Sequence, residues 1–301
     1  MRYILIPILF VCVLNMSCNS GTENNSDASD SISSDKVAEG KNLEVAPETL
    51  SLLELVKKEP ENHEENAKRL NTVAKAFIGA KKSRQGVNLL RQAIKSHYSA
   101  SSTVENALDL MNVYKSNFSG TDNASMKALA LKEAFPNFSQ MDKVSAMLPD
   151  GMSSIAAYIE DVRVNMTDKE SGRLDLKQAN KFINASEIAA MMLPTNKNAA
   201  PFLQKAGEVA RSIKAYPKSI EIYDWLMNAY PKAPEAAQAL FMKAFTYDNE
   251  MKDKAKAKSL YQEFLKKYPN DGFADDTQFL LDNIDKSNED IIKGFSKPQG
   301  N

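Results

Sequence analysis

Residues 223–231 read YDWLMNAYP, and residues 261–269 read YQEFLKKYP. Six positions recur at a shared offset of 38 residues (269 − 231 = 38): Tyr223, Leu226, Tyr230, Pro231, Ala236 and Phe241 return as Tyr261, Phe264, Tyr268, Pro269, Ala274 and Phe279. A period of this size in a helix-forming sequence indicates a solenoid, because one helix pair cannot bury its own apolar face and must stack on the next pair. The repeat therefore predicts an all-α solenoid of antiparallel helix pairs.

The unit that ends at Pro231 also contains small residues where two helices should approach each other. Ala206, Gly207 and Ala210 precede Tyr223, which we expect to fill the gap between the two helices. The unit that ends at Pro269 has Phe245 where a small residue is usual. Two further units are indicated nearer the N-terminus, the first with Leu70, Val73, Ala74, Phe77, Gly86, Leu90, Ala93 and Tyr98, and a weaker one with Leu108, Met111, Asn112, Ala124, Ala128, Leu131 and Pro136.

This alternation of large and small residues before a proline resembles the tetratricopeptide repeat, a helix-turn-helix unit of 34 residues. The longer, tyrosine-proline-ended form is similar to the repeats of bacterial envelope proteins of the BamD and CpoB types. Residues 206–210, 239–245 and 273–281 resemble tetratricopeptide lipoproteins of Bacteroidota-type bacteria. The resemblance implies a right-handed solenoid and an exported, non-enzymatic protein.

The N-terminal segment, residues 1–17, is predicted to be a signal peptide of the lipoprotein type. Arg2 supplies a positive charge, and Tyr3 to Leu14 form an apolar stretch that is long enough for a signal peptide and too short to span a bilayer. Residues 14–18 read LNMSC and resemble a lipobox, although Asn15 stands where leucine is usual. We expect lipidation at Cys18, and the alternatives are an uncleaved signal anchor or an ordinary secretory cleavage nearby.

The rest of the chain divides by composition and register. Residues 18–47 are polar and predict a disordered tether. Residues 48–137 are expected to form N-terminal repeats, 138–198 a helical insert in the middle of the solenoid, and 199–295 the C-terminal repeats with capping helices. Because the only cysteines are Cys12 and Cys18, the folded part can hold no disulfide and no cysteine metal site.

No constellation of catalytic residues is evident in the sequence. His63 and His97 stand beside no motif, and there is no phosphate-binding glycine loop, nucleophile elbow or zinc-protease helix. The pair Asp275 and Asp276 begins a predicted helix, where carboxylates interact favourably with the helix dipole. Lys and Arg number 38 against 39 Asp and Glu, so nucleic acid is a disfavoured partner. We therefore expect no enzymatic activity, no metal and no small-molecule cofactor.

Partner proteins are expected on a concave surface lined by the first helix of each pair. The predicted contact residues are Gln204, Glu208, Arg211, Met242, Thr246 and Asn249, with Lys68, Asn71, Lys75, Asn106, Asp109 and Val113 at the equivalent N-terminal positions. Trp225 lies off the repeat positions and is a further contact candidate.

The favoured hypothesis is a scaffold or adaptor, held by an N-terminal lipid in the outer membrane and facing the periplasm, that binds envelope or periplasmic proteins. One alternative is a nutrient-binding lipoprotein of the SusD type, which would be much longer and carry a large ligand-binding insertion. Another is an inner-membrane-anchored partner of a periplasmic chaperone. An enzyme would require a deep polar pocket with convergent carboxylates in residues 138–198.

Overall fold

The computed structural model describes residues 44–117, 121–148, 151–168, 171–287 and 289. The predicted signal peptide, Cys18 and most of the predicted tether lie outside these residues. The described chain is all-helical, apart from one isolated antiparallel bridge between Thr167 and Leu174. The predicted fold class, a solenoid of the tetratricopeptide type, is therefore confirmed.

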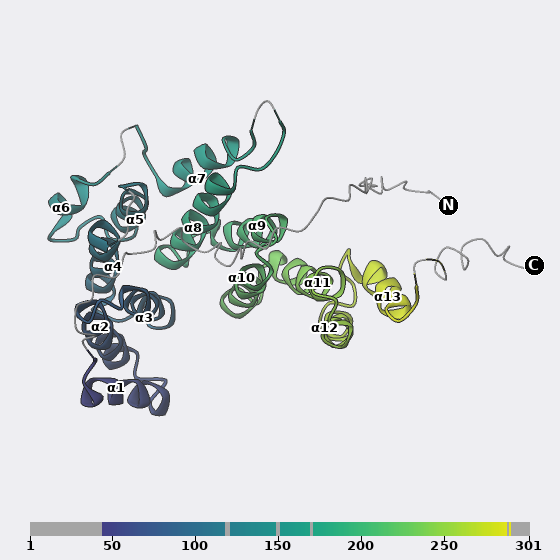
Figure 1. The fold of residues 1–301 in the computed structure, drawn as a ribbon, viewed down its shortest axis with the longest axis horizontal. Helices are drawn as coiled ribbons and strands as arrows, with labels where there is room; N and C mark the ends of the chain where they lie inside the picture. The colour runs from purple at the N-terminus through teal and green to yellow at the C-terminus, as the bar shows by residue number, and fades with distance from the viewer. Residues whose placement is uncertain (1–43, 118–120, 149–150, 169–170, 288, 290–301) are drawn as a thin grey trace, which may run out of the picture.

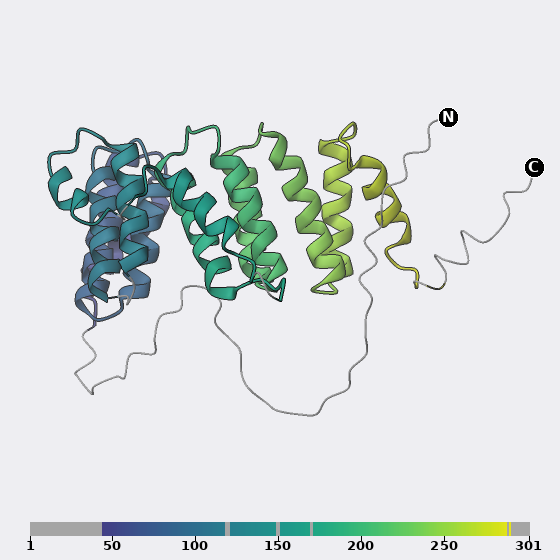
Figure 2. The same cartoon turned by 90° about the horizontal axis from the view of Figure 1, so that it is seen from above.

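Most of the helices stand side by side as neighbours along the chain (Figure 2). In chain order they are α1 (Pro47–Lys58), α2 (His63–Gly79), α3 (Ser83–Ser96), α4 (Thr103–Asn117), α5 (Thr121–Ala134), α6 (Met141–Ser145), α7 (Ile155–Val164), α8 (Leu176–Met192), α9 (Ala199–Ser212), α10 (Tyr216–Ala229), α11 (Pro234–Asn249), α12 (Lys254–Lys267) and α13 (Ala274–Asn283). Four pairs pack in the way that the repeat predicts: α2 with α3, α4 with α5, α9 with α10, and α11 with α12.

Glycine sets the distance between the helices of two pairs. A Cβ atom on Gly207 of α9 would lie 2.3 Å from Cε1 of Tyr223 in α10, whose side chain is fully buried. The hydroxyl of Ser219 also donates to the carbonyl of Gly207 at 2.8 Å. In the first pair, a Cβ atom on Gly86 would lie 2.8 Å from the carbonyl oxygen of Ala74. The prediction that small residues let the paired helices approach each other is confirmed.

Aromatic side chains contribute a large part of the core between α11, α12 and α13. Phe264 and Tyr261 are fully buried, and Phe241 stacks on Phe273 with ring centroids 4.7 Å apart. The bulky Phe245 fits because it lies at the edge of this core, partly buried, with its ring 6.2 Å from that of Phe241. Phe279, the repeat equivalent of Phe241, is 43 % exposed, since no further helix pair follows α13 in the described chain.

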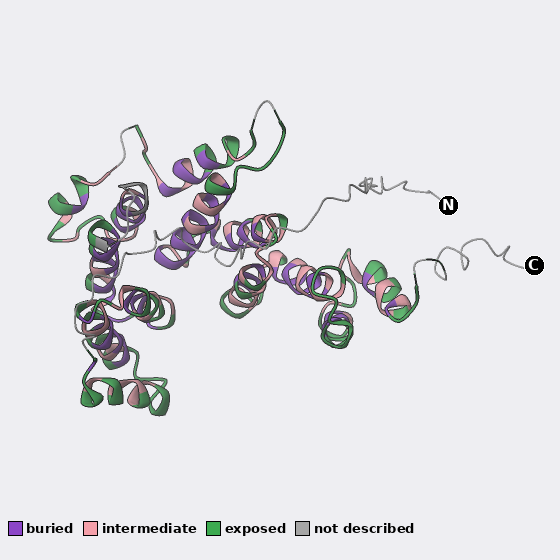
Figure 3. Ribbon diagram, in the orientation of Figure 1, coloured by how far each residue is buried: buried purple, intermediate pink, exposed green. Residues whose placement is uncertain are grey.

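The solenoid bends at α7 and α8 (Figure 1). Helices α1 to α5 form one arm and α9 to α13 the other, and α8 packs against α9 as well as against α3 and α5. Buried residues cover much of α8 (Figure 3). Helix α7 is joined to α5 by a hydrogen bond from the backbone N–H of Ile155 to the carboxylate of Glu133. The inner side of the bend carries α3 and α10, which are second helices of their pairs. The expectation that first helices line the concave side is therefore wrong at this bend.

Candidate interaction surface

A polar network joins the first helices of the two N-terminal pairs. The side-chain amide of Asn71 in α2 donates to Asn106 Oδ1 at 2.6 Å and to Asp109 Oδ2 at 2.8 Å in α4. Lys75 forms ion pairs with Asp109 at 3.1 Å and with Glu105 at 3.0 Å. The prediction that Asn71 and Asn106 face a partner is wrong, because both are buried and bond to each other.

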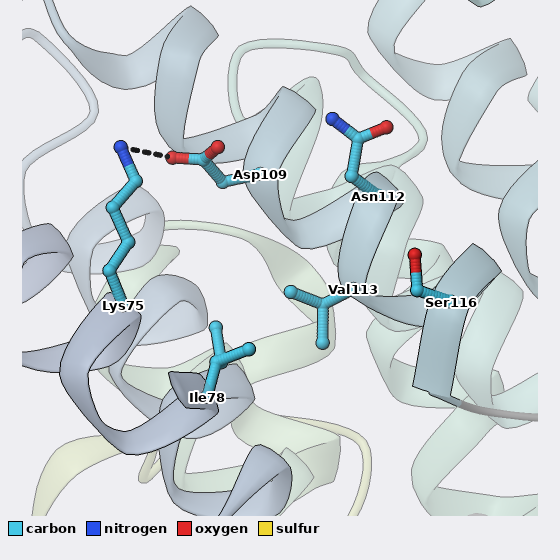
Figure 4. Close-up of a pocket in the computed structure, with 6 residues that line it drawn as sticks. All are labelled: Lys75, Ile78, Asp109, Asn112, Val113 and Ser116. Carbon is cyan, nitrogen blue, oxygen red and sulfur yellow. Dashed lines mark ion pairs between the residues drawn. The ribbon is translucent and has the colours of Figure 1, made fainter. Parts of the chain in front are cut away.

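An open pocket of 280 Å³ lies beside this network, between α2 and α4 (Figure 4). Its apolar part is formed by Ile78, which is partly buried, and by Val113, which is 8 % exposed. Asn112 and Ser116 stand exposed at its rim, and neither side chain forms a hydrogen bond with another described residue. The pocket thus combines a small apolar floor with a free amide and a free hydroxyl.

Lys75 closes the opposite side of the pocket and points toward Asp109 (Figure 4). Burial alone would lower the pKa of Lys75, but hydrogen bonds and charge from Glu105 and Asp109 outweigh burial and raise the pKa. The ammonium group is therefore charged and already neutralised by carboxylates. We expect the pocket to favour uncharged groups, because a second charge would have to displace one of these ion pairs.

The predicted C-terminal contact residues of α9 form a second polar network with α11. Gln204 donates to Gln238 of α11, and Gln238 donates to Glu208 Oε1 at 3.2 Å. Glu208 also forms an ion pair with Lys205 at 2.8 Å. Gln204 and Glu208 are partly exposed, so they remain accessible to a partner although they already have hydrogen-bond partners. Their role in partner binding stays a prediction.

Arg211 continues this surface toward the end of α11. Its guanidinium forms an ion pair with Glu250 at 3.5 Å, and the hydroxyl of Tyr216 donates to the same carboxylate at 2.8 Å. The hydrogen bond to Glu250 is the main reason that the pKa of Tyr216 is raised. The side chain of Arg211 also lies over the ring of Phe245, 5.9 Å from its centroid.

The three predicted residues of α11 differ in exposure. Asn249 is exposed and its amide donates to the carbonyl of Phe245 at 3.4 Å, whereas Met242 is partly buried between two apolar clusters. Thr246 is fully buried, and its hydroxyl donates to the carbonyl of Met242 at 2.7 Å. The prediction that Thr246 contacts a partner is therefore wrong.

Sequence reasoning missed three residues of the two surfaces and placed a fourth, Asn112, on a repeat position of the packed face, although the structure shows it exposed. Asn112 and Ser116 continue the face of α4 that Asp109 begins, and Gln238 lies one turn before Met242 on α11. Helical periodicity could have found all three. Tyr216 stands at the start of α10, outside the first helices, and no pattern in the sequence points to it.

The two histidines contact each other at one edge of the N-terminal arm. Nδ1 of His63 and Nδ1 of His97 are 2.9 Å apart, so one ring must donate and the other accept. Within the described ranges, no group of three or more histidine, cysteine, aspartate or glutamate side chains is placed to hold a metal ion. No helix among the described residues is both long enough and apolar enough to cross a membrane.

Part of the C-terminal arm matches a known protein family. Residues 238–271, which comprise most of α11 and all of α12, match the tetratricopeptide repeat family. No curated protein matches the chain. The match supports a tetratricopeptide repeat protein, and repeats of this kind indicate a scaffold for protein–protein interaction.

Proposed function

We propose that this protein is a membrane-anchored scaffold or adaptor that binds partner proteins in the bacterial cell envelope and performs no catalysis. The observation that carries the proposal is the open pocket between α2 and α4, where the free side chains of Asn112 and Ser116 stand over an apolar floor. The tetratricopeptide match in α11 and α12 supports the same class of function.

The pocket suits a short stretch of a partner polypeptide. An asparagine amide can donate to a peptide carbonyl and accept from a peptide N–H at the same time. Ile78 and Val113 can take one small apolar side chain, and burying apolar surface contributes about 25 cal/mol per Å². One such pocket gives low affinity, so we expect the partner to contact several repeats.

The surface of α9 and α11 provides polar contacts of a different kind. Gln204, Glu208 and Arg211 are held by neighbouring side chains in the absence of a partner. When a partner binds, these polar groups exchange hydrogen bonds to their neighbours for hydrogen bonds to the partner, so the net gain in affinity is small. Their fixed positions contribute more to the choice of partner than to affinity. We therefore assign specificity to this surface and apolar contact to the pocket between α2 and α4.

The proposed anchor is a lipid on Cys18, followed by residues 18–47 as a tether. A flexible chain of this length has a reach of roughly 30 Å, from about 5–6 Å times the square root of its length. Such a reach would hold the solenoid close to a membrane while leaving its first helices accessible. The outer membrane, with the solenoid facing the periplasm, is the localisation that we propose.

The proposal is tested by affinity capture from detergent-solubilised membranes of the native host cell. The intact chain is compared with an Asn112→Arg variant and with a Gln262→Arg variant, which places the same charge on an exposed position of α12. We expect Asn112→Arg to lose specific proteins that the other two retain. Equal capture by all three chains would contradict the proposed pocket.

The anchor is tested separately by mass spectrometry of the N-terminus of the same material. We expect acyl chains on Cys18 and loss of membrane association in a Cys18→Ala variant. An unmodified Cys18 in membrane-associated protein would contradict the anchor and leave the binding proposal intact.

A further inference from the structure

Charged residues from both arms meet around one carboxylate on the inner side of the bend. Glu187 of α8 is 1 % exposed and forms an ion pair with Lys218 of α10 at 2.8 Å and with Arg91 of α3 at 3.2 Å. Burial alone would raise the pKa of Glu187, but the charges of Arg91 and Lys218 outweigh it and lower the pKa to about 2. Glu187 is thus ionised and shared by two cations that come from different arms.

A third cation, Lys95 of α3, stands in the same place without a carboxylate of its own. Its Nζ lies 3.8 Å from the centroid of the Trp225 ring in α10, and it forms no ion pair with any residue that the structure describes. Burial, and then the positive charge of Arg91, lower the pKa of Lys95. The charges of Glu187 and Glu221 oppose this shift at longer range, and the Trp225 ring compensates the ammonium charge only in part.

Neither carboxylate of the cluster forms an ion pair with Lys95. The other nearby carboxylate, Glu221, is 3.3 Å from Lys218 and mostly exposed. Glu187 pairs with Arg91 and Lys218, and Glu221 pairs with Lys218, whereas both carboxylates act on Lys95 only at longer range, beside a partly exposed tryptophan. Tryptophan and arginine are enriched among the residues that dominate binding at protein interfaces, and a lysine without an ion pair among the described residues favours an acidic partner.

We propose that the inner side of the bend, at Lys95 and Trp225, binds an acidic segment of a partner protein. A carboxylate of that segment pairs with Lys95, and its stem packs on the indole ring. Arg91 and Lys218 belong to the same cluster, where both pair with Glu187, and they add positive potential near the site. This site is built from the second helices α3 and α10, so it is independent of the pocket between α2 and α4.

Trp225 makes the site directly observable, because it is the only tryptophan of the chain. The probe is an acetylated, amidated hexaglutamate peptide, titrated into the full chain at low salt while Trp225 emission is recorded. We expect a saturable change in emission, which hexaglutamine does not produce. We also expect the affinity to fall when the titration is repeated at about 0.5 M salt, because partly exposed charges are screened.

Variants locate the binding. Lys95→Met should weaken binding at least about tenfold, or roughly 1.4 kcal/mol. Lys95→Arg keeps the charge and should keep most of the affinity, which separates loss of charge from a loss of folding. Lys256→Met, which removes an exposed lysine of α12, is the matched control and should bind as the wild type does.

Three results would overturn the proposal. The first is the absence of a saturable change in emission. The second is an equal loss of affinity in Lys256→Met, which would mean binding to any lysine-rich surface. The third is the same response to inorganic phosphate at the same concentration, which would mean a site for small anions and not for an acidic segment.

Discussion

Replacing Gly207 by alanine tests the packing on which the repeat depends. The added Cβ atom would lie 2.3 Å from Cε1, 2.8 Å from Cδ1 and 2.9 Å from Cζ of Tyr223. Tyr223 is fully buried within an apolar cluster, and distances this short mean that either the ring or α10 must shift. Inserting a methyl group into a packed core costs about 1–3 kcal/mol.

The preference of helices for alanine over glycine offsets part of this cost. Alanine is favoured by about 1 kcal/mol in a helix interior. We therefore expect Gly207→Ala to lower the free energy of unfolding by up to roughly 2 kcal/mol, which corresponds to a decrease in Tm of up to about 8 °C. The assay is denaturant unfolding followed by circular dichroism, with thermal unfolding as a second measurement.

Gly79 provides the matched control, because it is also helical and a Cβ atom there would contact nothing within 4 Å. Gly79→Ala should be neutral or should stabilise the protein by about 0.4–1 kcal/mol. In a Tyr223→Leu background, Gly207→Ala should lose its cost, since the ring that it meets is gone. If Gly207→Ala stabilises the protein as Gly79→Ala does, the close approach of α9 and α10 is refuted.

Three further predictions concern the core and the buried ionisable groups. Tyr261→Ala should lower the free energy of unfolding by about 3–5 kcal/mol in denaturant unfolding, because it empties a buried site; an unchanged midpoint would exclude the described core. The pKa of Glu187 is lowered from 4.5 to about 2. The ionised carboxylate therefore stabilises the folded protein above pH 4.5, and this contribution, on the order of 3 kcal/mol, is lost as the pH falls toward 2. In an acid titration of its free energy of unfolding, the Glu187→Gln variant should lack this loss. Burial, and then the charge of His63, lower the pKa of His97 below 6.5. The neutral imidazole therefore contributes stability above pH 6.5, and this contribution is lost as the pH falls below that value. Between neutral and mildly acidic pH, the Tm of His97→Gln should decrease less than that of the wild type, and an equal decrease in both proteins would exclude this histidine pair as the cause.

The helix pairs could be predicted from sequence because their determinants are local. Tyr223 recurs as Tyr261, Gly207 occupies a repeat position where a small residue is usual, and a helix pair brings such positions together whatever the rest of the chain does. Helices α7 and α8, in the predicted insert, also follow their apolar periodicity. The bend between the arms has no such local signal, because it depends on how α8 packs against α3, α5 and α9.

The candidate surfaces were predicted less well because polar residues can be buried when they pair with each other. Asn71 and Asn106 are 35 residues apart and share a hydrogen bond, and Thr246 bonds to a carbonyl of its own helix. Either arrangement removes the cost of burial that makes polar residues look exposed in a sequence. Glu187 forms an ion pair with Arg91, which lies 96 residues earlier in the chain (187 − 91 = 96). The only sign in the sequence that Glu187 is buried is its position within a run of apolar residues.

The central claim, that the first helices bind a partner protein, is tested most directly by site-specific photocrosslinking in intact native cells. A photoreactive amino acid is placed at Asn112 beside the pocket, and in a second strain at Gln262 on α12, both of which are exposed. We predict a discrete protein adduct from position 112 and none from position 262. No adduct at position 112, or the same adducts at both positions, would contradict the account.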